Sequence, residues 1–278
     1  MFKKRFFIIS LILIYWPLSI FFANTPKDFL NYLLPTLLIL IAYLLYRRKN
    51  QYYLVPTLAI PFIQPKLAVL PLVFVIIDGI YSFKSKKKIN KFVIIASLII
   101  LMLFFKPFRN QSIFVTDNNS KQEVIQKIHL YPNIPLARLF QNKARIYLDK
   151  LNNNFFSLTD PSNYFFGFQP RQISLNNQNL DKYPFLTLIP FLFGTYYFGK
   201  NKNLKFILIT FIGSILTLSL LTNFDRHDFI LWLPISLVII FGLDKLESKL
   251  ANKTKYFNFI FVLFGIAQLL RLFVQYLK

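Results

Sequence analysis

The chain has 278 residues, of which 55% are hydrophobic, and its mean hydropathy is +0.47. A soluble domain typically carries about 45–50% apolar residues, so this composition favours a membrane protein. The formal net charge is +22, but most of the lysines and arginines stand in short clusters between apolar runs. Such clusters are typical of the cytoplasmic loops of membrane proteins, and we therefore expect no nucleic-acid partner.

Metal-binding and redox motifs are missing from the sequence. It contains no cysteine, which excludes disulfides and thiolate metal sites. The two histidines, His129 and His227, lie far apart and belong to no metal-binding pattern. We expect neither a metal nor another cofactor.

Long apolar runs predict the membrane-spanning helices, each of which needs about 20 predominantly apolar residues. The first run, at 6–23, follows a basic start as a signal peptide would. The bulky Phe21 and Phe22 stand where a cleavage site needs small residues, so we expect a retained first span. The other predicted long spans are 29–46, 67–83, 92–105, 185–199, 206–222, 229–243 and 256–277.

The proline-rich run at 52–63 is shorter, because its 12 residues make only about 18 Å of helix. One basic cluster, at 47–49, precedes this run, and another, at 84–91, follows the next predicted span at 67–83. Both clusters can be cytoplasmic only if the chain crosses the membrane an even number of times between them. We therefore predict that 52–63 crosses as a broken helix among the others, which gives an all-α membrane bundle of about nine spans.

The distribution of charge predicts how this bundle is oriented in the cell membrane. The predicted inner loops hold 18 lysines and arginines, at 3–5, 47–49, 84–91, 200–205 and 245–255. The short outer loops hold three such residues, which are Lys27, Lys66 and Arg226. By the positive-inside rule the amino terminus is cytoplasmic and the carboxyl terminus is outside. The predicted parts are amino-terminal spans at 1–105, an extracytoplasmic module at 106–184 and carboxyl-terminal spans at 185–278.

Two helices are predicted at the start of the outer module. Ser120 and Glu123 fit a capping box, which predicts a short helix at about 121–130. Pro135 suits the first position of a second helix, whose apolar residues recur at helical spacing up to about position 151. This helix is basic and amphipathic. Either it rests on the bundle or on headgroups, or Arg138 and Arg145 bind an anionic headgroup.

Further along the module, Thr159-Asp160-Pro161 is a helix-start signal. The aromatic cluster at 164–168 that follows is typical of a membrane interface, although a sugar could also stack there. The remaining segment, at 169–182, is predicted to be loop.

Two places carry candidate functional groups. Asp78 lies inside a predicted span, where a charge is costly and points to function, unless it is hydrated or paired with a lysine near the cytoplasmic interface. The outer loop at 223–228 contains Asp225, Arg226, His227 and Asp228. Arginine suits phosphate binding, histidine can donate to a phosphate or carry a proton, and the two aspartates are candidate acids. The alternative is a solvated turn with local ion pairs.

The runs 136–143, 154–156 and 164–167, together with Tyr147, resemble the carboxyl-terminal part of bacterial GT-C-type, mannosyltransferase-like membrane glycosyltransferases. The resemblance covers about residues 120–245 and includes Arg226-His227 ahead of Leu233-Pro234. It implies transfer of a sugar from a polyprenyl-phosphate donor at the outer membrane face, helped by an acid in a long first outer loop. Here that loop, at 24–28, is short and Asp28 is its only acid, so no catalytic residue can be assigned.

Our first hypothesis is a truncated or divergent glycosyltransferase-like membrane protein that binds membrane lipid and a polyprenyl-phosphate-linked sugar. Arg226, His227 and Arg138 would face the donor phosphate, and a membrane protein partner could supply the missing amino-terminal half. The second hypothesis is a non-catalytic partner or assembly subunit. A transporter is disfavoured, because the central spans carry almost no charge.

Overall fold

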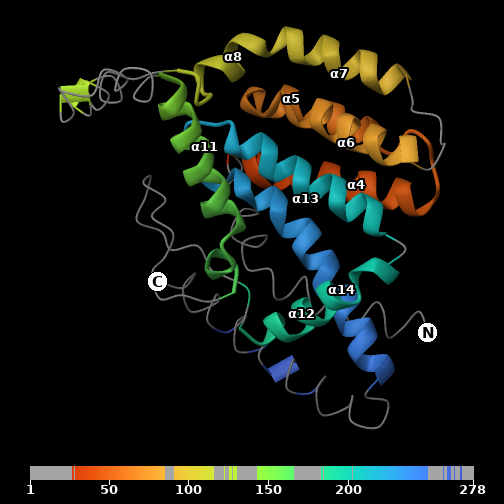
Figure 1. The fold of residues 1–278 in the computed structure, drawn as a ribbon. Helices are drawn as coiled ribbons and strands as arrows, with labels where there is room; N and C mark the ends of the chain where they lie inside the picture. Colours follow the sequence, from red (N-terminus) through yellow and green to blue (C-terminus); the bar gives the residue numbers. More distant parts are fainter. Residues whose placement is uncertain are drawn as a thin grey trace.

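The fold is known from a computed structural model (Figure 1). It describes residues 29–84, 91–115, 143–165, 185–201 and 203–249. It also describes isolated positions at 27, 122, 125, 126, 128, 129, 183, 259, 262, 263, 266 and 270. The predicted first span at 6–23 lies outside the described residues, as do most of the predicted last span at 256–277 and half of the predicted helix at 121–130, whose described positions are helical. Within the described residues the secondary structure is helical, with one isolated bridge between Ser112 and Leu221. The predicted all-α class is confirmed for this part of the chain.

Short helical pieces alternate with longer helices along the chain. The longer helices are α4 (Leu34–Arg47), α6 (Leu70–Lys84), α7 (Lys91–Leu103), α11 (Lys143–Thr159), α12 (Leu188–Tyr196), α13 (Leu204–Ser219) and α14 (Trp232–Lys249). The shorter pieces are η1 (Phe29–Leu33), η2 (Val55–Ala59), α5 (Ile60–Ile63), η3 (Pro65–Leu67), α8 (Phe105–Asn110), η4 (Pro161–Asn163), η5 (Phe185–Thr187), η6 (Phe198–Lys200) and η7 (Asp225–Leu231).

Helix α14 lies in the most deeply buried of the three described stretches that are long and apolar enough to cross a membrane. Within the most apolar 18 residues of each stretch, 78% are buried in His227–Lys249, which contains α14. The corresponding shares are 33% in Phe29–Arg47 and 39% in Pro65–Ser82. The closest neighbour of α14 is α12, and two glycines permit the approach. A Cβ added at Gly242 would overlap the backbone of Pro190, and one added at Gly194 would overlap the backbone of Val238.

One end of the bundle, here called the lysine-rich end, joins α4, α6 and α13. Asn203 donates a hydrogen bond to the Tyr43 hydroxyl over 3.1 Å, and Lys205 donates one to the Ser82 hydroxyl over 3.0 Å. The carboxyl ends of α4 and α6, at Arg47 and Lys84, and the amino end of α13, at Leu204, therefore lie at the same end of the bundle. The charge pattern predicts that the basic clusters next to these helix ends lie in loops on one side.

The opposite end, here called the histidine end, carries Asn31, Ser112, Leu221 and His227. The segment at 52–63 connects the two ends. Tyr53 contacts Asp78 at the lysine-rich end, whereas Gln64 donates a 2.6 Å hydrogen bond to Asn31 at the histidine end. This short segment runs between the two ends in broken form, as η2 followed by α5; that it crosses a membrane stays a prediction.

Helix α11 covers the histidine end, where it packs against α13 (Figure 1). The sequence predicted an amphipathic helix from about 136 to 151, and the described helix runs from Lys143 to Thr159. The start signal at 159–161 is confirmed, because the Asp160 side chain accepts a hydrogen bond from the Ser162 backbone at the beginning of η4.

Three helical stretches of the described chain are long and apolar enough to cross a membrane: Phe29–Arg47, Pro65–Ser82 and His227–Lys249. The other apolar helices, Lys91–Leu103, Phe185–Tyr196 and Leu204–Ser219, are shorter. The predicted count of nine transmembrane helices is not supported. Several predicted runs within the described residues form shorter helices, because they contain turns and short 3-10 pieces.

Candidate functional sites

The segment that contains the candidate phosphate-binding residues folds as the 3-10 helix η7 and packs against η1, α13 and α14. His227 is only 2% exposed and Asp228 5% exposed, so this part of the segment is not a solvated turn. The His227 ring lies 4.8 Å from the Tyr32 ring, and the positive charge of Lys66 acts on it. His227 is therefore a packed residue within the histidine end.

Of the other predicted binding residues, only Arg145 is described with its side chain. It forms an exposed ion pair with Asp149, one helical turn later, at 3.1 Å. The backbone of η7 places Asp225 and Arg226 directly before His227. Their side chains, and all of Arg138, lie outside the described residues, so the grouping of these residues around one ligand stays a prediction.

Two chain segments meet at the histidine end through backbone hydrogen bonds. The Ile113 amide donates to the Leu220 carbonyl over 2.9 Å, and the Thr222 amide donates to the Gln111 carbonyl over 2.8 Å. The Thr222 hydroxyl adds a 2.7 Å bond to the Ser112 carbonyl. This pairing attaches the start of the predicted outer module to the loop between α13 and η7.

Helix α11 is attached to the same loop by Asn154. Its side-chain amide donates to the carbonyls of Leu221 at 2.7 Å and Ser219 at 3.3 Å. These two carbonyls lie at the carboxyl end of α13, where the helix can no longer satisfy them internally. Described parts of the predicted outer module thus contact residues 219–222, directly before the predicted outer loop at 223–228; that both lie on the outer side stays a prediction.

The aromatic cluster predicted to lie at the membrane interface is partly inside the protein. Tyr164 and Phe165 are each 4% exposed. Tyr183 stacks between Phe165 and Trp232, with ring centroids 5.7 Å and 4.3 Å away, and its hydroxyl donates to the Trp232 carbonyl at 2.9 Å. Burial raises the pKa of the Tyr183 phenol, which stays neutral. These described residues form a core, and an interfacial or sugar-stacking role for Tyr164 and Phe165 does not fit their burial.

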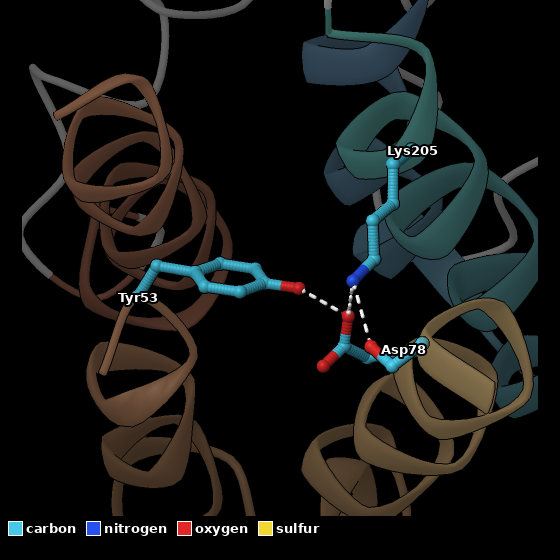
Figure 2. A network of polar contacts seen from close by, with 4 residues as sticks. Tyr53, Asp78 and Lys205 are labelled. Atoms are coloured by element: carbon cyan, nitrogen blue, oxygen red, sulfur yellow. Dashed lines mark hydrogen bonds and ion pairs between the residues drawn. The ribbon is translucent and has the colours of Figure 1, made fainter. Parts of the chain in front are cut away.

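A group of charged and polar side chains surrounds Asp78 at the lysine-rich end (Figure 2). The Tyr53 hydroxyl donates to the Asp78 carboxylate over 2.6 Å, and the Lys205 ammonium forms an ion pair with the same oxygen. The side chains of Lys205 and Asp78 are 20% and 14% exposed. Asp78 is therefore paired with a lysine, as one of the two sequence alternatives expected.

Sequence reasoning did not identify Tyr53 and Lys205, the partners of Asp78. The available signal was Asp78 itself, because a carboxylate within an apolar helix requires a cation or donors nearby. The ion pair with Lys205 and the hydrogen bond from Tyr53 neutralise the Asp78 carboxylate and fix its position. Together they join α6, α13 and the start of the broken segment at 52–63. They do not create a known catalytic arrangement.

In the part of the chain that the structure describes, no group of three or more histidines, cysteines or carboxylates is placed to hold a metal ion. Comparison of the chain with protein-family models, with curated proteins and with solved structures gave no match. The function must therefore be argued from the residues themselves and from the resemblance described above.

Proposed function

We propose that this chain is a multi-pass membrane protein whose histidine end binds a polyprenyl-phosphate-linked sugar, as in GT-C-type glycosyltransferases. The observation that carries the proposal is the pairing of Gln111–Thr222 and Ile113–Leu220. This pairing brings two segments with basic residues together. Arg109 is three residues before Ser112, and Arg226 is five residues after Leu221.

Lys66 adds a third cation to this end, because η3, on which it lies, packs against α8 and its charge acts on His227. A phosphate is well matched to such a group, since a guanidinium can form two parallel hydrogen bonds with it and an ammonium a third. Asp225 and Asp228 remain the candidate acids of this end. Asp228, being almost fully buried, would require the loop to open before it could reach a substrate.

The proposal includes an orientation. The lysine-rich end would face the cytoplasm, because its loops carry most of the basic residues, and the histidine end would face outward. The chain has no cysteine, so single cysteines can be introduced at Asn119, Asn223 and, for the lysine-rich end, Lys49. We expect an impermeant maleimide to label the first two in intact cells and the third only after lysis. Labelling of Lys49→Cys in intact cells would overturn the orientation.

Binding tests the proposed ligand directly. The purified chain would be titrated with a polyprenyl phosphate as wild type, as Arg226→Ala and as Arg47→Ala. The last variant loses the same charge at the opposite end. We expect Arg226→Ala to bind at least about tenfold more weakly, as for the loss of one charge-assisted hydrogen bond of about 1.5–3 kcal/mol, and Arg47→Ala to bind like wild type. Equal binding by all three proteins would remove Arg226 from the site.

A second experiment separates an enzyme from a partner subunit. The purified chain is incubated with a radiolabelled polyprenyl-phosphate sugar and a membrane extract as the source of acceptor. Transfer that requires only this chain would exclude the partner hypothesis. Transfer that requires a second membrane protein with a long acidic outer loop would support a split enzyme.

A further inference from the structure

The outward face of η5 and α12 is a continuous apolar stripe, here called the α12 stripe. Phe185, Ile189, Leu192 and Tyr196 are all exposed, with Tyr196 at 81%, and they recur at the spacing of one helical face. The opposite face of the helix packs on α14 through Pro190 and Gly194. From Phe185 to Tyr196 the stripe is about 17 Å long at 1.5 Å per residue, which is close to one leaflet of the roughly 30 Å hydrocarbon core.

Two ammonium groups stand at the end of this stripe, around Tyr197, and a third lies one turn earlier on α14. The Lys249 ammonium donates a hydrogen bond to the Tyr197 hydroxyl and lies 4.8 Å from the centre of its ring. The Lys200 ammonium lies 6.0 Å from the same ring centre. Lys245, one turn before Lys249 on α14, lies over the Phe241 ring at 5.5 Å.

The acids near this cluster do not share its helix face. Asp244 and Glu247 are the acids of α14 in this region, and residues one or two positions apart on a helix point in different directions. Lys245 and Lys249, four positions apart, do share a face. The cluster consequently presents a concentrated positive charge beside the exposed Tyr196.

We infer that the α12 stripe (Phe185, Ile189, Leu192, Tyr196) and the lysine cluster (Lys200, Lys245, Lys249) together bind an anionic glycerophospholipid of the surrounding bilayer. The acyl chain would lie along the stripe, and the headgroup phosphate would be held by the three ammonium groups. Tyrosine and lysine side chains are the residues that anchor a helix at the headgroup level, and each lysine near an anionic membrane surface attracts it. A zwitterionic lipid fits the stripe but not the excess of positive charge.

Native mass spectrometry of the full chain in detergent tests this inference, with dioleoylphosphatidylglycerol as the anionic lipid and dioleoylphosphatidylcholine as the zwitterionic comparator. The site variant is Lys200→Gln, Lys245→Gln and Lys249→Gln together. Its matched control is Arg47→Gln, Arg48→Gln and Lys49→Gln, which removes the same charge from another loop of the lysine-rich end. These residues are exposed, except the half-buried Lys245, so both variants should fold, which their thermal unfolding would verify.

We expect wild type and the control variant to retain one tightly bound phosphatidylglycerol and the site variant to bind it at least about tenfold more weakly, with phosphatidylcholine binding weak in all three. An equal loss in both variants would show a diffuse electrostatic attraction and overturn the site. Unchanged binding by the site variant, or equal affinity of wild type for the two lipids, would also overturn it. The outcome is independent of the ligand proposed for the histidine end, because neither triple variant alters that end.

Discussion

The Lys205 ammonium, in the first turn of α13, forms an ion pair with the Asp78 carboxylate of α6. The same carboxylate accepts a 2.6 Å hydrogen bond from Tyr53, so one anion joins three segments that are distant in the sequence (Figure 2). Removal of one partner from a largely desolvated pair leaves the other charge uncompensated, which is costlier than replacing both. This asymmetry leads to the first prediction.

Asp78→Ala should lower the free energy of unfolding by about 2–4 kcal/mol, because Lys205 and Tyr53 lose their common acceptor. The double variant Asp78→Leu with Lys205→Met should recover at least half of that loss. Unfolding in detergent can be followed by tryptophan fluorescence, since Trp232 is buried.

Asp149→Ala is the control for this experiment. Asp149 is also paired, with Arg145, but the two side chains are 39% and 61% exposed, so the loss should be no more than about 0.5 kcal/mol. Equal effects of Asp78→Ala and Asp149→Ala would show that the network at Asp78 does not hold the helices together.

The second prediction concerns the contact between α12 and α14. Gly242→Ala should destabilise the protein by several kcal/mol, because its Cβ would overlap the Pro190 carbonyl and backbone atoms cannot rotate away as a side chain does. Overpacking of this kind costs about 1–3 kcal/mol even where side chains can adjust. Gly199→Ala is the matched control, since a Cβ there meets nothing within 4 Å. A stable, correctly folded Gly242→Ala protein would contradict the close packing of these two helices.

The third prediction concerns the attachment of α11 to the histidine end. Asn154→Ala removes the donor to the Leu221 and Ser219 carbonyls and should cost about 1–2 kcal/mol. The exposed Asn152 provides the control, because Asn152→Ala should leave stability unchanged. Limited proteolysis gives a second measurement, since a detached α11 should be cleaved sooner. Identical cleavage of the two variants would indicate that other contacts hold α11.

The sequence predicted the features of this fold that depend on local pattern. The basic clusters at 47–49, 84–91 and 200–205 were predicted to lie in loops on one side, and the helices that precede or follow them do end together. The broken segment at 52–63 followed from the same charges. The positions of the basic clusters and of the broken segment depend on the direction of the chain and on how often it runs from one end of the bundle to the other. Both can be inferred from the sequence without knowing how the side chains pack.

Features that depend on packing were predicted less well. From the sequence, Asp78 could be either hydrated or paired with a lysine. That its partner is Lys205 follows only from the packing of α6 against α13. The sequence did not predict that His227 is buried and packs against the Tyr32 ring; its role toward a donor phosphate stays a prediction. Tyr164 and Phe165 were expected at the interface and are buried beside Tyr183. Aromatic residues serve cores and interfaces equally well, so composition alone cannot separate the two environments.

The fourth prediction tests the buried position of Tyr183. Its hydroxyl is held by the Trp232 carbonyl and the Ser236 hydroxyl within an apolar stack, so Tyr183→Phe should cost about 1 kcal/mol while keeping the ring contacts. Tyr183→Ala should cost about 3–5 kcal/mol, because it also empties the space between Phe165 and Trp232. Tyr196→Phe, at a side chain 81% exposed, should have no measurable effect. If Tyr183→Ala were as stable as Tyr196→Phe, the stack between Phe165, Tyr183 and Trp232 would not be part of the core, and these rings would again be candidates for a sugar-binding surface.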